Sequence, residues 1–331
     1  MRLWAFVLAL AVGFVGGTTA RAASNATPIV GTDQLAEAQG FFNAKRYREA
    51  ITLLDAYLTK NSRDAHALVL RGDAKASIDD DTGALADYNA AIELAPTYQY
   101  AYETRCETRL ELNDGDGAMA DCNAAIRLDP ADAKAYEDRA DVHFDLESYQ
   151  AALDDYDKAA ELGWVSPYLF AARCDANRLT GHLDRAAEDC AKTLVLDPRG
   201  RRGLWANGRL AMSTGRYQDA ILRWNAYILE DQTHSDAAYY YRASSFTRTG
   251  NAKAALQDIE TYVHRKPNDA DGYRERAFAR AATGDTAGAV ADLKEAGRLY
   301  ERDGDARAVE GLRSFAAALQ AGKPLPQLPA P

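Results

Sequence analysis

The sequence predicts an all-α fold in which pairs of helices stack one after another. A frame of small, aromatic, small and proline residues recurs at a fixed spacing: Ala84, Tyr88, Ala91 and Pro96 return 34 residues later as Ala118, Cys122, Ala125 and Pro130. Only 10 of the 331 residues are proline, and alanine, the strongest helix former, is frequent throughout. A repeat of this length is typical of a solenoid built from small, similar units.

Residues 1–22 precede the repeats and have the layout of a cleaved secretory signal. A basic Arg2 is followed by the apolar run from Leu3 to Val15 and by the small-residue ending Ala20-Arg21-Ala22. The apolar run is shorter than the roughly 18 residues that argue for a membrane span. We therefore expect cleavage, a linker over residues 23–30, and a protein exported to the periplasm or secreted. The alternative is an uncleaved start that anchors the chain to a membrane.

Eight units follow in step with the frame. They cover residues 31–64, 65–98, 99–132, 133–166, 167–200, 201–235, 236–269 and 270–303. Each unit has a first helix, a short turn and a second helix that carries the alanine and aromatic positions. Small residues let the paired helices approach, and aromatic residues fill the space to the next pair, so a single unit cannot bury its apolar face alone. The units are therefore predicted to stack.

This arrangement resembles the tetratricopeptide repeat family, whose unit is a helix-turn-helix of about 34 residues. The resemblance covers residues 31–303 and implies a right-handed superhelical solenoid of about eight repeats. The first unit lacks the closing proline, Trp164 replaces it in the fourth and Gln232 replaces it in the sixth.

The segment after the last unit carries one apolar stripe at helical spacing, formed by Ala306, Val309, Leu312, Phe315 and Leu319. This pattern predicts a helix over residues 304–322 that caps the open end of the stack. The proline-rich tail, residues 323–331, cannot continue a helix and is predicted to be extended and disordered.

The four cysteines form two pairs of equal spacing. Cys106 and Cys122 are 16 residues apart, and so are Cys174 and Cys190. In an antiparallel helix pair these places lie at one level on facing surfaces, so each pair is positioned to form a disulfide between its own two helices. Disulfides persist in the oxidising compartments that exported proteins enter. The alternatives are unpaired cysteines that fill core places, or a shared zinc site, which stacked helix layers would hold too far apart.

Arginine recurs at the seventh place of the units and aspartate at the twenty-third. Both fail together in the sixth unit, which has Asn207 and Arg223 instead. This joint failure indicates that the two places pair, as an internal row of Arg–Asp bridges. The alternative is a row of arginines that binds an anion.

Residues typical of catalytic sites are nearly absent. The chain has no glycine-rich phosphate loop, no serine elbow and no paired zinc histidines. Asp141, His143 and Asp145 lie two residues apart on a predicted helix, where they point to different sides. We therefore expect no catalytic residue, no cofactor, no metal and no enzymatic activity.

The resemblance also implies a concave groove lined by the first helices. Its candidate residues are Tyr100, Glu103, Glu107, Glu137, Asp141, Phe144, Tyr168, Arg178, Arg202, Trp205, Arg209, Tyr240, Arg248 and Arg274. Residues 65–166 carry 23 Asp or Glu against 8 Lys or Arg, whereas residues 167–303 carry 19 against 21. An acidic surface repels nucleic acid and anionic lipid. We expect a protein or peptide partner, and the face of Arg202, Trp205 and Arg209 is the candidate hot spot.

The expected function is a non-catalytic interaction scaffold or adaptor in a cell-envelope process. One alternative is a thiol or redox-active protein, or an enzyme accessory, that uses the cysteines. Another is an architectural envelope component that binds through its convex face. The oligomeric state and the identity of the partner do not follow from the sequence.

Overall fold

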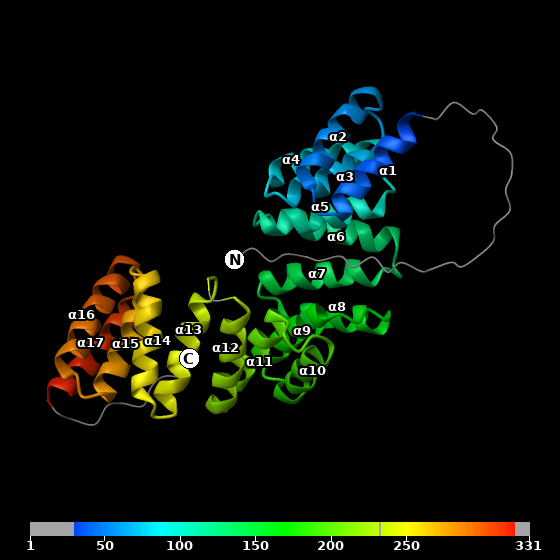
Figure 1. Cartoon of the computed structure of the whole chain (residues 1–331). Helices are drawn as coiled ribbons and strands as arrows, with labels where there is room; N and C mark the ends of the chain where they lie inside the picture. Colours follow the sequence, from blue (N-terminus) through cyan, green and yellow to red (C-terminus); the bar gives the residue numbers. More distant parts are fainter. Residues whose placement is uncertain (1–29, 232, 322–331) are drawn as a thin grey trace. The chain divides into compact units, whose positions relative to one another are not determined.

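A computed structural model describes residues 30–231 and 233–321 of the chain. The predicted signal sequence, nearly all of the linker, the proline-rich tail and Gln232 lie outside the described residues. The described residues form helices joined by short turns and contain no strand, so the all-α prediction is confirmed for this part of the chain (Figure 1).

The chain divides into two compact units between Glu147 and Ser148. The first unit holds α1 (Val30–Asn43), α2 (Tyr47–Lys60), α3 (Ala65–Ala76), α4 (Asp81–Leu94), α5 (Gln99–Glu111), α6 (Gly115–Leu128) and α7 (Ala133–Asp145). The second unit holds α8 (Tyr149–Glu161), α9 (Pro167–Leu179), α10 (Leu183–Leu196), α11 (Arg201–Ser213), α12 (Tyr217–Glu230), α13 (Asp236–Arg248), α14 (Ala252–Arg265), α15 (Ala270–Ala282), α16 (Thr286–Arg302) and α17 (Ala306–Gln320).

Within each unit consecutive helices pack against one another, and each hairpin packs against the next. The first helices α3, α5, α9, α11, α13 and α15 begin at the residues where the sequence predicts repeats to begin. First helices of neighbouring hairpins also touch one another, α3 against α5 and α5 against α7 in the first unit, and α9 against α11 and α13 against α15 in the second. The side chains that they bring together therefore come from residues about one repeat apart.

The turns inside the hairpins depend on one residue with a left-handed backbone. Gly181 and Gly215 supply it in the second unit with φ of 82° and 71°, a region that glycine adopts without strain. In the first unit Asp79 and Asn113 take the same place with φ of 69° and 60°, and short polar side chains tolerate it better than most others.

Close contact between small and aromatic residues joins the two helices of a hairpin. Gly208 of α11 lies against the fully buried Trp224 of α12, and a Cβ added there would meet the indole at 2.6 Å. Gly72 of α3 lies in the same way against Tyr88 of α4. The helices approach closely because these positions carry no side chain.

The last helix, α17, packs on α16 and covers the end of the second unit's core. Val309, Leu312 and Phe315 are buried, and the ring of Phe315 meets that of Phe278 edge-on at 4.8 Å between centroids. Among the described residues, no helix combines the length and the apolar character that crossing a bilayer requires.

Candidate functional site

Paired arginine and aspartate side chains join the first and second helices of the hairpins. Arg105 of α5 donates from Nε and Nη2 to the two carboxylate oxygens of Asp121 on α6, at 2.8 and 2.6 Å. The same two-bond pairing links Arg71 to Asp87, Arg173 to Asp189, Arg242 to Asp258, and Arg276 to Asp292. The predicted pairing is therefore present in five hairpins, and its role is structural.

The remaining guanidinium nitrogen reaches the preceding hairpin. Nη1 of Arg105 donates to Asn89 at 2.6 Å, and Nη1 of Arg173 donates to Asp157 at 2.9 Å. One arginine thus joins three helices, which uses the fixed fork of donors that lysine lacks.

The sixth repeat replaces this arrangement with another. Asn207 of α11 donates from its amide to the carbonyl of Cys190 and to Oγ1 of Thr193, at 2.8 and 3.2 Å. The junction between α10 and α11 is therefore held by a neutral hydrogen-bonded amide.

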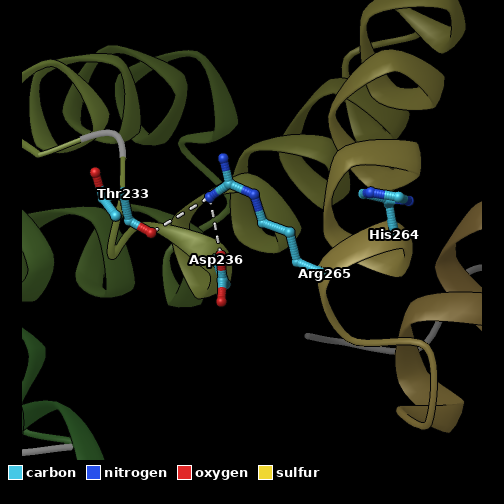
Figure 2. A pocket seen from close by; sticks show the side chains of 4 residues that line it. All are labelled: Thr233, Asp236, His264 and Arg265. Atoms are coloured by element: carbon cyan, nitrogen blue, oxygen red, sulfur yellow. Dashed lines mark hydrogen bonds and ion pairs between the residues drawn. The ribbon is translucent and has the colours of Figure 1, made fainter.

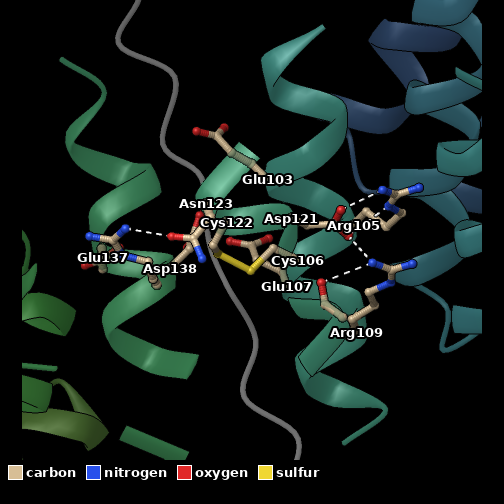
Figure 3. Close-up of a disulfide and its surroundings, with 12 residues drawn as sticks. Glu103, Arg105, Cys106, Glu107, Arg109, Asp121, Cys122, Asn123, Glu137 and Asp138 are labelled. Atoms are coloured by element: carbon tan, nitrogen blue, oxygen red, sulfur yellow. Dashed lines mark hydrogen bonds and ion pairs between the residues drawn. A yellow bond between two sulfur atoms is a disulfide. The ribbon is translucent and has the colours of Figure 1, made fainter. Parts of the chain in front are cut away.

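All four cysteines of the chain are joined in disulfides between α5 and α6 and between α9 and α10. Cys106 and Cys122 form one bond and Cys174 and Cys190 the other, the same pairs that the spacing predicts. Figure 3 shows the first bond between its two helices, with the Arg105 and Asp121 pair beside it. All four residues are at most 1% exposed, so the bonds lie inside the hairpins.

Candidate groove residues in the first unit form an acidic face on α3, α5 and α7. Tyr100 and Tyr88 donate from their hydroxyls to the two carboxylate oxygens of Asp73, at 3.2 and 2.9 Å. Burial raises the pKa of the Asp73 carboxyl to about 7, although the two hydroxyls favour its charged form. Tyr100 therefore links α5 to α3 and is only partly available to a ligand.

The acidic face continues around Lys134 at the start of α7. Its Nζ lies 2.6 Å from Oε1 of Glu107 on α5 and 3.8 Å from Oε2 of Glu137, and it also contacts Oδ1 of Asp138. These carboxylates hold the pKa of Lys134 well above its ordinary value, although burial acts in the opposite direction. Three carboxylates share one ammonium group here.

Glu103 lies beside this cluster and is buried. Gln99 donates from Nε2 to Glu103 and to Asp132, the latter at 2.6 Å. Burial, followed by the hydrogen bond to Asp132, raises the pKa of the Glu103 carboxyl to about 8. Asp141 and Phe144 lie half-buried on the same helix as Lys134.

Candidate groove residues in the second unit combine arginine with tyrosine. Arg202 of α11 lies over the ring of Tyr168 on α9, with 3.9 Å between Cζ and the ring centroid. Arg209 donates to the hydroxyl of Tyr241 at 2.6 Å. These contacts again join first helices of neighbouring repeats.

The arginines of α13 and α15 also have partners. Arg274 donates to the hydroxyls of Tyr300 and Tyr240, at 2.7 and 3.3 Å. Arg248 donates to the carbonyl of Ser244 at 3.1 Å and lies 4.0 Å from Oε1 of Glu275. Arg178 pairs with Asp175 on its own helix at 3.0 Å.

Trp205 is half-buried in a cluster of four rings. Its centroid lies 5.3 Å from that of Trp224 and 5.5 Å from those of Tyr227 and Tyr241. Such edge-to-face contacts between aromatic rings stabilise a core. Trp205 is therefore a packing residue as much as a candidate contact for a ligand.

Two residues of the acidic face escaped the sequence analysis. Lys134 and Asp138 stand at the second and sixth places of the fourth repeat, and neither is among the candidate groove residues. The signal that points to Asp138 is a comparison of the repeats, because the sixth place is acidic only in Asp138 and Glu275 among the eight repeats.

A depression of about 620 Å³ lies elsewhere, between α13 and α14 (Figure 2). It is lined by Thr233, Asp236, His264 and Arg265, and Arg265 pairs with Asp236 at 3.0 Å. The charges of Arg265 and Asp236 therefore balance one another within the depression. No group of ligating side chains suited to a metal ion occurs among residues 30–231 and 233–321.

The geometry can be compared with known proteins. The sequence model of the tetratricopeptide repeat family matches residues 35–98, 107–167 and 206–270. A TPR repeat-containing thioredoxin of Arabidopsis thaliana is 33% identical over 89 residues, which cover 27% of this chain and 23% of that protein. The chain therefore matches less than a quarter of this relative's length.

Solved structures agree with the helical-repeat arrangement. A chain of the APC/C hetero-tetramer Cut9-Hcn1 has a TM-score of 0.68 at 14% identity, over 86% of this chain and 55% of that one. A tetratricopeptide repeat protein from Parabacteroides merdae has a TM-score of 0.57 at 18% identity, over 75% and 98%. PilW, a type IV pilus biogenesis factor, has a TM-score of 0.58 at 18% identity, over 62% and 96%. At such identities the likeness shows the fold alone.

Proposed function

The chain belongs to the tetratricopeptide repeat family, and we propose that it is a non-catalytic scaffold that holds a protein or peptide against its first helices. Tetratricopeptide repeats generally mediate interactions between proteins, and function depends on the site rather than the fold. The observation that carries the proposal is the concentration of charged and aromatic side chains on first helices, acidic in the first unit and rich in arginine and tyrosine in the second.

The proposed guest is an extended segment or a helix. Lysine or arginine suits the acidic face of α3, α5 and α7, and carboxylate or carbonyl groups suit the arginines of the second unit. Nucleic acid is a poor candidate, because the chain has a net charge of -10 and residues 65–166 alone carry 23 acidic against 8 basic side chains.

We further propose that the protein is exported and works in the periplasm or outside the cell. The predicted signal sequence supports this location, and so do two buried disulfides, because such bonds persist in oxidising compartments. Expression in a bacterial host followed by fractionation tests it: we expect a mature chain that begins after Ala22, and a cytoplasmic chain of full length would contradict the proposal.

Affinity capture with matched charge variants tests the scaffold role. Glu107→Lys and Arg202→Glu reverse a charge on first helices, whereas Glu93→Lys reverses one at an exposed place on the second helix α4. We expect the captured protein to be lost with the first two variants and at high salt, and to be retained with Glu93→Lys. Equal capture by all three variants would contradict the proposal.

A second candidate is architectural and uses the second helices. Val195 of α10 and Leu229 of α12 occupy equivalent places one repeat apart and are 81% and 75% exposed. In most other repeats this place carries a charged residue or histidine, namely Glu93, Arg127, Glu161, His264 and Arg298. If this surface binds the partner, Val195→Glu or Leu229→Glu abolishes capture while Glu107→Lys does not.

The redox alternative has less support. All four cysteines are paired and nearly inaccessible, whereas a redox-active pair needs an exposed, acidic thiol. We propose that the disulfides are structural. Rapid reduction of either bond in the folded protein by a dithiol reductant would reopen the redox role.

A further inference from the structure

Arg202 and Arg209 of α11 differ from the other arginines on the first helices of the second unit. Every other arginine on α9, α11, α13 and α15 lies within 4.0 Å of a carboxylate oxygen. Among residues 30–231 and 233–321, Arg202 and Arg209 have no such partner. Both side chains are half-buried. The positive charge on this face of α11 is therefore not balanced by a carboxylate in contact with it.

The preceding repeat does not supply a carboxylate to Arg202. In the first unit, Lys134 meets Glu107, which stands 27 positions before it on the preceding first helix. Asp175 of α9 stands at the same distance before Arg202 in the sequence. Its carboxylate, however, pairs with Arg178 of its own helix at 3.0 Å. The carboxylate that the repeat pattern assigns to Arg202 is therefore already engaged.

Tyrosine rings hold the two guanidinium groups in place. Cζ of Arg202 lies 3.9 Å from the ring centroid of Tyr168 on α9, and Cζ of Arg209 lies 4.9 Å from that of Tyr241 on α13. A ring face attracts a cation without accepting its in-plane N–H groups. Of the five N–H donors on each guanidinium, Arg209 uses one, from Nη1 to the hydroxyl of Tyr241 at 2.6 Å, and Arg202 uses none on a described residue. Donors on both groups therefore remain for a ligand.

Trp205 lies between the two arginines along α11. The three residues are three and four positions apart, so they share one face of the helix. At a rise of 1.5 Å per residue, the backbone positions of Arg202 and Arg209 are about 10.5 Å apart. The ring of Trp205 is half-buried and packs against Tyr241. This face therefore offers two cationic groups on either side of an aromatic ring.

We propose that Arg202 and Arg209 together bind two side-chain carboxylates, about 10 Å apart, of an acidic segment of the guest, and that an apolar residue between them contacts Trp205. The inference rests on the proposed scaffold function and names the chemistry that its second unit recognises. Charge complementarity favours this occupant, because a guanidinium fork matches a carboxylate through two parallel N–H···O bonds. A polyproline II segment rises about 3.1 Å per residue, so acidic residues three positions apart meet the spacing on one side.

The test is an NMR titration of the full chain with the peptide N-acetyl-Glu-Pro-Pro-Glu amide at constant ionic strength. We expect saturable shifts of the Nε–H signals of Arg202 and Arg209 and of the indole N–H signal of Trp205. The peptide with two glutamines should bind at least about tenfold more weakly, because charged acceptors form stronger hydrogen bonds than neutral ones. The peptide with one glutamate and one glutamine should bind with intermediate affinity.

Three results of this titration would overturn the proposal. Equal binding of the two-glutamate and two-glutamine peptides would show that charge is not recognised. Equal binding of the two-glutamate and one-glutamate peptides would show that the arginines do not act together. Displacement of the two-glutamate peptide by an equal concentration of inorganic phosphate would indicate a general anion site.

Variants locate the site. Arg202→Gln and Arg209→Gln should each weaken binding of the two-glutamate peptide about tenfold. The matched control is Arg216→Gln, which removes a 53% exposed guanidinium outside α11 and should leave binding unchanged. Arg202 donates no hydrogen bond to a described residue, so its variant is expected to fold even if Arg209→Gln, which loses the bond to Tyr241, does not. Unchanged binding by Arg202→Gln, or an equal loss with Arg216→Gln, would contradict the assignment.

The outcome separates this inference from the scaffold role. If the two-glutamate peptide does not bind but guest capture is lost with Glu107→Lys, the scaffold role stands and the carboxylate site is wrong. If the peptide binds at Arg202 and Arg209 but capture is unaffected by every first-helix variant, the carboxylate site stands and the proposed function is wrong.

Discussion

Arg173 and Asp189 hold each other by two parallel hydrogen bonds across the α9–α10 hairpin, at 2.9 and 2.6 Å. The side chains of Arg173 and Asp189 are 11% and 4% exposed, and a third bond from Arg173 to Asp157 reaches the preceding helix. The pair therefore fixes the register of the α9–α10 hairpin, and Arg173 also fixes the position of this hairpin against the preceding helix α8.

Removing one member of this pair should destabilise the second unit strongly. Arg173→Met leaves the buried carboxylate of Asp189 without its cation, and breaking such a pair costs about 3–5 kcal/mol. Urea unfolding measures the change. The matched control is Arg185→Met, which removes a 51% exposed partner of Asp157 and should change the free energy of unfolding by less than about 1 kcal/mol. Equal effects of the two variants would show that burial does not determine how much the Arg173–Asp189 pair contributes to the free energy of unfolding.

The two disulfides should contribute similar amounts to the stability of their units. Each closes a loop of 16 residues in sequence separation, and the chain-entropy model gives about 3 kcal/mol for such a loop. Replacing either pair by alanines should lower the midpoint of thermal unfolding, and the four-alanine variant should no longer respond to reductant. If reductant lowers the midpoint of that variant as much as that of the native chain, the effect has another cause.

Replacing either of two glycines in the second unit by alanine should change the stability of the protein, in opposite directions for the two positions. Gly208→Ala places a methyl group 2.6 Å from the ring of Trp224, so overpacking should destabilise the protein by about 1–3 kcal/mol. Gly297 lies inside α16 with nothing within 4 Å of an added Cβ, so Gly297→Ala should stabilise by about 0.5–1 kcal/mol. Thermal unfolding of both variants checks the prediction. An unchanged unfolding midpoint for Gly208→Ala would mean that α11 and α12 move apart to make room for the methyl group.

Stability should fall as the pH rises from acid to mildly basic values. The pKa of the Asp73 carboxyl is raised from 3.8 to about 7 and that of Glu103 from 4.5 to about 8, chiefly by burial. The folded chain therefore holds protons that the unfolded chain releases, so their stabilisation is present at low pH and lost as the pH rises through the folded values.

The double variant Asp73→Asn with Glu103→Gln removes both titrations. We expect its free energy of unfolding in urea to depend less on pH than that of the native chain, over the range from the unfolded pKa of 3.8 to the folded pKa of about 8. Glu93→Gln, at an exposed place, is the control and should keep the native slope. An unchanged slope in the double variant would show that the two carboxyls are not buried in solution.

Much of the candidate site followed from position in the repeat, but its detail did not. The pairing of arginine with aspartate was predictable because both places fail together in the sixth repeat, at Asn207 and Arg223. The packing role of Trp205 was not predictable, because the exposure of its ring depends on whether Tyr241 of the next repeat packs against it. Lys134 and Asp138 were missed because charge balance between helices has no local signature.

The sequence by itself determined the helix pairs, their starting residues and the cysteine spacing, because each depends on a periodic pattern that is local to one repeat. Only the tertiary structure decided which side chains of neighbouring first helices meet, as Arg202 meets Tyr168 and Lys134 meets Glu107. The physical reason is that these contacts join residues 34 and 27 positions apart, and side chains that far apart meet only after the hairpins have stacked.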